Sequence, residues 1–385
     1  MPRWLYYLLL LAVIAPLIEM FGGAQFSTVI FVFSALSLIP LAALIGQTTE
    51  DLSYYVGPTA GGLLNATFGN APEIIIGIFA LRQGLLTVVK ASITGSIIGN
   101  SLLVLGGALA LGGWRWGRQY FDTRDAGQYA VMMVMAVAGL LIPYVASQEV
   151  ADSRRMQEIS IGISVILLII YVLYLALHIF HIRANRRNPR KARGLITPPS
   201  AADSDADEAA RQDEVSAVTG HLELPDGDRP EPPRVWVTVP LLLLATAATA
   251  WNSELLVGAI QPVARELGWS PVFIGLVIIP IVGNAAEHSS ALLVAYRDRV
   301  DLSMAIAAGS SIQVATFVAP LLVLVSLFYP QHLDLVFSPL ELVLLALATI
   351  LFRFLCIDGE TTWLAGAQLV AVYIMACVVF FLLPS

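Results

Sequence analysis

The sequence predicts an all-α, polytopic membrane protein with about 11 transmembrane helices, and three observations lead to this fold class. Hydrophobic residues make up 57% of the 385 residues, charged residues make up 13%, and the mean hydropathy is +0.78. Apolar runs of about 20 residues, the length that crosses a bilayer as a helix, recur along the chain. A short motif with an acidic residue occurs twice within these runs. This composition excludes an ordinary soluble globular domain.

The predicted helices follow one another with short connections and one long interruption. The first can also be read as a signal peptide, because Arg3 precedes an apolar run that ends in small residues. Glu19 and the immediate start of the next apolar run favour a helical hairpin instead. The predicted spans lie near residues 4–22, 26–47, 57–81, 86–112, 127–147, 157–181, 235–257, 270–296, 302–328, 339–356 and 361–383.

The chain divides into four parts at the long interruption. We expect an N-terminal transmembrane helix (1–24), a first five-helix repeat (25–181), a hydrophilic loop (182–234) and a second five-helix repeat (235–385). The loop begins with basic residues and then becomes acidic, and Ser200 and Asp203 have the spacing of a capping box. It therefore contains a predicted short acidic helix, which is either part of a solubilising linker or an element that attracts cations or regulates transport.

The basic residues predict the orientation of the helices in the membrane. If the N-terminus is inside, only five of the 21 Lys and Arg residues lie outside, and the other 16 lie inside. Cytoplasmic loops are enriched in Lys and Arg, so we expect a cytoplasmic N-terminus and an outside C-terminus. The five residues expected outside are Arg82, Lys90, Arg154, Arg155 and Arg265.

An internal repeat relates the two halves at an offset of 214 residues. The motif Gly-Asn-Ala-Pro-Glu at 69–73 aligns with Gly-Asn-Ala-Ala-Glu at 283–287. The same offset, without a gap, aligns Ala91, Gly95, Ser96 and Ile98 with Ala305, Gly309, Ser310 and Ile312. Because each half has five spans, an odd number, the halves must have opposite orientations. This inverted-topology repeat is typical of secondary transporters, whose binding site lies near the bilayer midplane.

The two motifs supply the candidate ligands of a cation. A charged side chain at the centre of a membrane span costs about 2.5–3.5 kcal/mol, so Glu73 and Glu287 need a bound cation or proton. Asn70 and Asn284 lie three residues before these glutamates, on the same helix face. Carboxylate and amide oxygens suit a hard cation such as calcium, and the neighbouring sequence has no soft ligand.

The next helix of each half adds further polar side chains. Ser96 and Asn100 share a helix face, as do Ser310 and Gln313. Val314 stands at the position equivalent to Asn100, so the expected site is only pseudo-symmetric.

These motifs resemble the cation/proton exchanger (CAX) family of calcium/proton antiporters, within the calcium/cation antiporter superfamily, over nearly the whole chain. The resemblance implies that Glu73 and Glu287 bind calcium and protons in turn. It also implicates His288 in proton coupling, because Glu-His occurs at this place in the family, whereas the first motif has Ile74 after its glutamate. The other residues that it places along the ion path are Asn70, Ser96, Asn100, Asn284, Ser310 and Gln313.

Several of these residues have a structural alternative. Asn70 and Asn284 can satisfy backbone groups freed by the glycines and the proline, and Ser96 and Ser310 can bond back to carbonyls one turn earlier. His288 can cap a neighbouring carbonyl. Three further glutamates are expected outside the site: Glu341 in a capping box with Ser338, and Glu50 and Glu254 at the interface or an entrance.

We therefore expect a secondary active antiporter, not an enzyme, which exchanges calcium for protons by alternating access. Its predicted partners are calcium, protons and membrane lipid, with no cofactor and no nucleic acid, in a bacterial-type inner (plasma) membrane. A sodium/calcium or manganese/proton exchanger of the same fold is the main alternative, although Gly69 and Val314 lack oxygens expected in sodium-coupled relatives. An intramembrane enzyme using Ser310 or Ser311 with His288, or a passive cation channel, is an alternative of another class.

Overall fold

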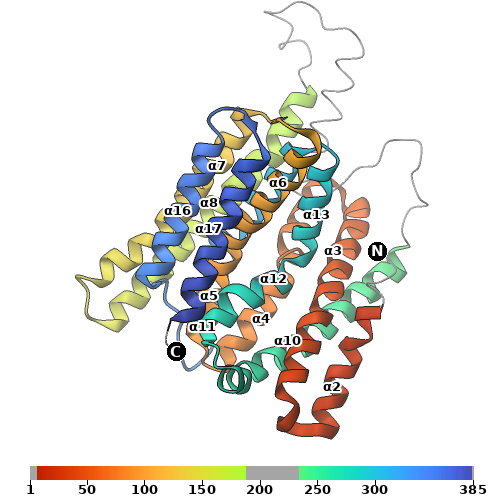
Figure 1. Cartoon of the computed structure of the whole chain (residues 1–385), viewed down its shortest axis with the longest axis vertical. Coiled ribbons are helices and arrows are strands. Elements are labelled where there is room, and N and C mark those ends of the chain that lie inside the picture. The colour runs from red at the N-terminus through yellow and green to blue at the C-terminus, as the bar shows by residue number, and fades with distance from the viewer. Residues whose placement is uncertain (1–6, 188–233, 384–385) are drawn as a thin grey trace, which may run out of the picture.

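The computed structural model describes residues 7–187 and 234–383, and most of these residues are helical. Figure 1 shows the longer helices side by side along the long axis of the molecule. The predicted acidic helix lies outside the described residues. One two-stranded antiparallel sheet pairs β1 (Gln119–Tyr120) with β2 (Glu360–Thr361).

The first half contains α2 (Leu11–Gly22), α3 (Ser27–Phe68), α4 (Ala71–Arg82), α5 (Leu86–Ile98), α6 (Leu105–Trp116), α7 (Thr123–Ser147) and α8 (Ser153–Arg187). The second half contains α10 (Val235–Leu267), α11 (Pro271–Phe273), α12 (Ile279–Gly283), α13 (Ala285–Tyr296), α14 (Val300–Gln313), α15 (Ala319–Ser326), α16 (Pro339–Leu355) and α17 (Trp363–Leu382). A short 3₁₀ segment, η1 (Gly23–Phe26), joins α2 to α3, and wider π-helical turns interrupt three helices at η2 (Gly99–Val104), η4 (Ile274–Ile278) and η5 (Val314–Val318).

The described residues include seven helices that are long and apolar enough to cross a membrane, or eight if the bent pair 271–283 and 285–296 forms one span. The all-α membrane fold is confirmed, but the count of about 11 is not. The predicted connection at 48–56 is helical, because α3 runs from Ser27 to Phe68 without a break. Two further apolar helices, Leu11–Gly22 and Pro339–Leu355, are shorter than a usual span.

Both motifs break a helix in the same way. Asn70 has φ −94° and ψ 13°, and Asn284 has φ −95° and ψ 15°. Each asparagine precedes a new helix, α4 or α13, and the segments on either side of Asn284 meet at 61°. Pro72 fits the first turn of α4, because a residue there needs no backbone N–H for the helix. The pseudo-equivalent residues therefore place Glu73 and Glu287 at equivalent positions.

The connections between helices gather on two opposite faces. On one face, Gln119 Nε2 donates to Asp298 Oδ1 at 3.4 Å, and Trp116 Nε1 donates to the Tyr296 carbonyl at 3.1 Å. On the other face, Gly84 lies beside Gln331. The turns that contain Gly84 and Asp298 are equivalent at the offset of 214, and they lie at opposite ends of the long helical segment 86–116. The two halves are inverted, as predicted.

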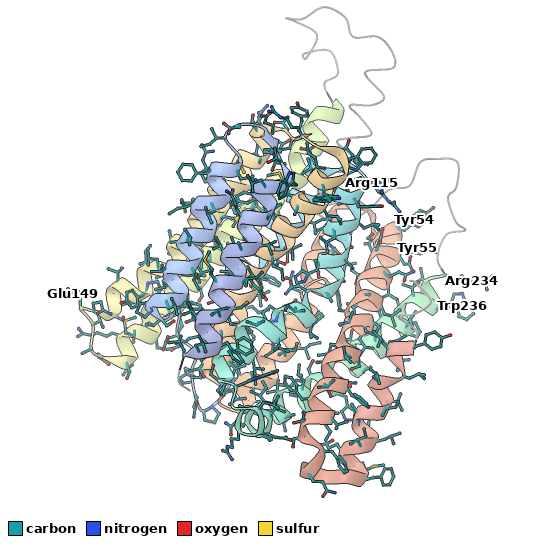
Figure 2. All side chains as sticks on the ribbon, viewed as in Figure 1. Tyr54, Tyr55, Arg115, Glu149, Arg234 and Trp236 are labelled. Carbon is teal, nitrogen blue, oxygen red and sulfur yellow. The ribbon has the colours of Figure 1, made fainter. Side chains whose placement is uncertain are left out.

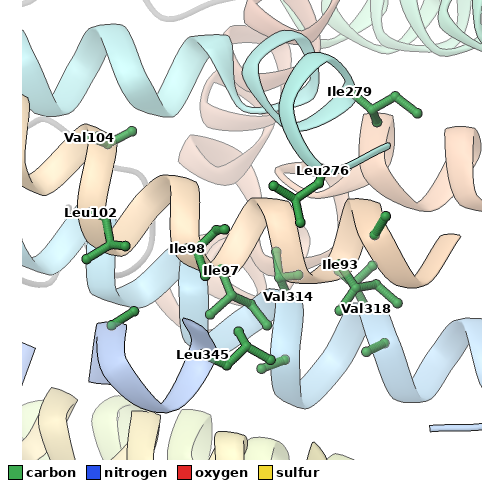
Figure 3. Close-up of a cluster of buried hydrophobic side chains, with 14 of the residues drawn as sticks. Ile93, Ile97, Ile98, Leu102, Val104, Leu276, Ile279, Val314, Val318 and Leu345 are labelled. Atoms are coloured by element: carbon green, nitrogen blue, oxygen red, sulfur yellow. The ribbon is translucent and has the colours of Figure 1, made fainter. Parts of the chain in front are cut away.

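The central helices are the most buried and bring the halves together. In the segment 86–116, 83% of the most apolar window is buried, compared with 33% for 153–176. Figure 3 shows Ile93 and Ile97 of α5 near Val314 and Val318 of η5. Side chains of α7 and α8 project from the periphery, with Glu149 at the tip of their hairpin in Figure 2. The predicted polar residues thus lie inside a shell of apolar helices.

Candidate functional site

Glu73 and Glu287 each lie in the first turn of a helix, α4 and α13. The exposed N–H groups and the dipole at a helix N-terminus stabilise nearby negative charge. The Glu73 carboxylate reaches the helix break of the other repeat, since a Cβ atom on Gly283 would lie 3.0 Å from its Oε1. The helix breaks at Asn70 and Asn284 therefore give each acidic group a helix N-terminus, with Glu73 facing the motif that contains Glu287.

Both carboxylate oxygens of Glu73 are buried, and neither has a hydrogen-bond partner within the described part of the chain. They border a cavity of about 10 Å³, which is the size of about one water molecule. A buried carboxylate without a partner is costly, so this group needs a proton or a cation. The cavity is lined by Glu73, Ser92, Ile93, Ser96, Ile279, Val314, Val318 and Leu322.

The repeats contribute to this cavity from both sides. A Cβ atom added to Gly283, the first residue of the second motif, would lie 3.0 Å from Oε1 of Glu73. The glycine therefore leaves room for the carboxylate of the other half. Among residues 7–187 and 234–383, no group of three or more His, Cys, Asp or Glu residues is arranged to hold a metal ion. A cation between the two glutamates would take its remaining ligands from neutral oxygens.

The predicted neutral residues form hydrogen bonds between the halves. Asn70 Nδ2 donates to Gln313 Oε1 at 2.7 Å, and Asn284 Nδ2 donates to Ser96 Oγ at 3.1 Å. Asn100 Nδ2 donates to Ser310 Oγ at 2.8 Å. Five of the six are less than 9% exposed, and Gln313 is half-buried. The structure thus joins the six neutral residues that the resemblance placed along the ion path into two hydrogen-bonded sets, Asn70 with Gln313 and the other four with one another.

These contacts can be compared with the purely structural roles that the sequence also allowed for the asparagines, the serines and His288. Asn284 does bond a backbone group, since its Nδ2 lies 3.1 Å from the Pro280 carbonyl, but this carbonyl also accepts from the Asn284 backbone N–H at 3.0 Å, and Nδ2 bonds Ser96 as well. The Ser310 hydroxyl reaches the Asn284 side chain at 3.4 Å instead of a carbonyl of its own helix. The His288 ring meets Asn100 Oδ1 at 3.1 Å instead of a backbone carbonyl.

Two serines beside the predicted residues also bridge the halves. Ser101 Oγ and Ser311 Oγ are 3.0 Å apart, and Ser311 also contacts the carbonyls of Ala307 and Ile97. Each directly follows a predicted site residue, but the sequence assigned neither to the ion path and named Ser311 only as a nucleophile of the alternative enzyme. Because the Ser311 hydroxyl is held by serine and carbonyl oxygens, and His288 faces Asn100, the contacts do not form the nucleophile and base of a hydrolase.

The three glutamates expected outside the site lie apart from it. Glu341 forms a capping box with Ser338, as predicted. Glu254 pairs with Arg82 at 3.1 Å on a solvent-exposed surface. Glu50 lies within α3, so it does not end a helix.

Comparisons with known proteins cover both halves of the chain. A family model described as sodium/calcium exchanger protein matches residues 26–180 and 237–382. A Ca²⁺/H⁺ antiporter of Synechocystis is 38% identical over 360 residues, or 93% of this chain and 92% of the relative. Ca²⁺/H⁺ antiporter ChaA of Bacillus subtilis is 39% identical over 93% of each chain. The solved structure of native YfkE has a TM-score of 0.76 and 34% identity, over 98% of this chain and 100% of that chain.

Proposed function

This chain belongs to the sodium/calcium exchanger protein family and, within it, to the cation/proton exchangers, and from that premise we propose that it exchanges calcium for protons by alternating access. The direct support for the exchanged ions is that relatives of 38–39% identity over nearly the whole length are named Ca²⁺/H⁺ antiporters. The protein is an integral membrane protein, and we place it in a bacterial-type inner membrane with a cytoplasmic N-terminus.

The observation that carries the proposal is the buried, unpartnered carboxylate of Glu73, which lies against Gly283, the first residue of the motif that contains Glu287. Without a cation, two desolvated carboxylates that repel each other are stabilised by taking up protons. A calcium ion stabilises the ionised forms and displaces those protons. The same two groups then bind either ligand but not both, and this competition couples the movement of calcium to that of protons.

The neutral residues complete the proposed calcium site. Calcium takes six to eight oxygen ligands, of which two carboxylates supply at most four. We assign the remaining ligands to neutral oxygens of the hydrogen-bonded residues between the repeats, of which Ser96 lines the cavity beside Glu73. These are the side-chain oxygens of Asn70, Ser96, Asn100, Asn284, Ser310 and Gln313.

Val314 supports protons over sodium as the coupling ion. This side chain lines the cavity beside Glu73, so a methyl group occupies a place where sodium-coupled relatives are expected to have an oxygen. Sodium needs oxygen ligands of its own, whereas a proton needs only a carboxylate.

Transport by the purified protein in proteoliposomes tests the proposal. A proton gradient should drive calcium uptake against its concentration gradient, and a sodium gradient of equal size should not. Uptake driven by sodium alone would establish the alternative exchanger. Calcium flux that only runs down its own gradient would identify a passive channel.

A further inference from the structure

Five side chains form a continuous hydrogen-bonded chain through the proposed site, and they come from both repeats. His288 on α13 contacts Asn100 on η2, and Asn100 contacts Ser310 on α14. Ser310 contacts Asn284, which contacts Ser96 on α5. The successive distances are 3.1, 2.8, 3.4 and 3.1 Å. The chain ends at the cavity that Ser96 shares with Glu73.

A backbone carbonyl sets the direction of this chain. One end of the Asn284 amide lies 3.1 Å from the carbonyl oxygen of Pro280. A carbonyl oxygen can only accept a hydrogen bond, so this end of the amide must be the NH₂ group. Oδ1 of Asn284 therefore faces Ser310, and the hydroxyl of Ser310 must donate to it.

The donor and acceptor roles of Ser310, Asn100 and His288 then follow in that order. Ser310 has a single hydroxyl hydrogen, which is committed to Asn284, so Ser310 accepts from Asn100. Asn100 must present its NH₂ group to Ser310, which leaves its Oδ1 facing the histidine ring. Because Oδ1 only accepts, the nitrogen opposite it, Nε2 of His288, must carry a hydrogen.

We propose that His288 is a positioning residue, whose Nε2–H anchors a hydrogen-bond chain that runs in one direction through Asn100, Ser310 and Asn284 to Ser96. This hydrogen is present in the charged ring and in the Nε2–H form of the neutral ring, so His288 can donate to Asn100 whether or not Nδ1 is protonated. The inference rests on the proposed function and assigns protons within the same site.

The far end of the chain explains what such an anchor accomplishes. Ser96 accepts from Asn284, so its own hydroxyl hydrogen remains for the cavity that it shares with Glu73. A donor held in place there stabilises an ionised carboxylate or orients a water molecule toward it. Loss of the histidine donor leaves Oδ1 of Asn100 without its partner and frees this amide, a proposed calcium ligand, to turn, whereas the Pro280 carbonyl still holds the amide of Asn284.

Three variants test this assignment in the proteoliposome assay. His288→Ala removes the donor and should raise the KM for calcium about tenfold, the usual effect of losing one buried hydrogen bond. His288→Gln supplies an amide NH₂ that reaches about as far as Nε2, and it should recover most of that loss although it cannot titrate. Ser289→Ala is the matched control on α13, because Ser289 is exposed and bonds only within its own helix.

The result that would overturn the proposal is a glutamine variant as impaired as the alanine variant, or an alanine variant with the normal KM. Nitrogen NMR of the wild-type protein labelled at histidine gives an independent answer that needs no variant. It should show His288 protonated at Nε2, and a ring protonated at Nδ1 alone would refute the chain. Glu73→Gln tests the proposed site separately: if this variant still exchanges calcium for protons, coupling through the paired carboxylates fails, whatever the histidine variants do.

Discussion

The carboxylate of Glu73 in the first repeat lies against Gly283, the residue that begins the motif of the second repeat. A Cβ atom at Gly283 would lie 3.0 Å from Glu73 Oε1, closer than most carbon–oxygen contacts. The helix break in one half therefore makes the space that the acidic group of the other half occupies. A site built in this way depends on both halves at once, and it changes when the contact between them changes.

Gly283→Ala should impair calcium binding with little effect on folding. The added methyl group meets the far end of the Glu73 side chain, which yields by a few tenths of an ångström, so the contact is relieved at the carboxylate and not in the backbone. We expect the KM for calcium to rise about three- to tenfold in proteoliposomes. Gly309→Ala is the control, because a Cβ there meets nothing within 4 Å. An unchanged KM in Gly283→Ala would show that the carboxylate is not held at this place.

Gly95→Ala should destabilise the protein, although its pseudo-equivalent Gly309→Ala should not. A Cβ at Gly95 would collide with the backbone carbonyl of Leu276 and lie 2.7 Å from Cγ of Pro280. The backbone of η4 cannot yield as a flexible side chain can, so we expect a loss of about 1–3 kcal/mol or more. Thermal unfolding in detergent measures the effect, and equal midpoints for the two variants would contradict the close approach of α5 and η4.

Lys90→Met should destabilise the protein more than Arg82→Met. Lys90 Nζ donates to Asp334 at 2.6 Å and to the Val336 carbonyl at 2.8 Å, and its side chain is only 18% exposed. Hydrogen bonds to charged groups contribute about 1.5–3 kcal/mol. The Arg82–Glu254 pair is 61% and 48% exposed, and such pairs contribute about 0–1 kcal/mol. Unfolding midpoints in detergent at low and high salt give the comparison, and a larger loss in Arg82→Met would refute it.

Ser338→Ala should weaken the start of α16. The Ser338 hydroxyl accepts from the Glu341 backbone N–H at 3.3 Å, and Glu341 Oε2 accepts from the Ser338 N–H at 2.9 Å. Losing an N-cap side chain costs about 1 kcal/mol, and Ser338→Thr should retain most of the stability. A threonine variant as unstable as the alanine variant would mean that the hydroxyl does not cap this helix.

The features that could be predicted from the sequence are those that depend on local chemistry or on the repeat. The offset of 214 predicted two equivalent motifs, and Asn70 and Asn284 have backbone angles within 2° of each other. The capping box follows from the three-residue spacing between Ser338 and Glu341. The inverted repeat follows from an odd number of spans in each half.

The predicted connection at 48–56 was wrong because polar residues there are satisfied within the helix. The hydroxyl of Thr48 bonds back to the carbonyls of Leu44 and Ile45, and that of Ser53 bonds back to Glu50. Hydropathy treats these residues as a loop, whereas their hydrogen bonds allow α3 to continue. A hydropathy average over a window of residues takes no account of such side-chain bonds to carbonyls of the preceding turn.

The cross-repeat hydrogen bonds could not be predicted from spacing either. Asn70 meets Gln313, which has glycine as its equivalent in the first half, so repeat symmetry gives no partner for it. The direction of the chain from His288 depends on one carbonyl, that of Pro280, which accepts from both the backbone N–H and the side-chain amide of Asn284. Such contacts join residues 188 to 243 positions apart and need the packed structure.

The central claim is that Glu73 and Glu287 together bind either calcium or protons, and calcium uptake into proteoliposomes under an imposed proton gradient tests it most directly. Glu73→Gln and Glu287→Gln should each abolish uptake while the protein remains folded, since a neutral amide can neither release a proton nor stabilise calcium with its charge. Ser289→Ala, on the same helix as Glu287, should transport as the wild type does. Uptake at the wild-type rate in either glutamine variant would contradict the claim.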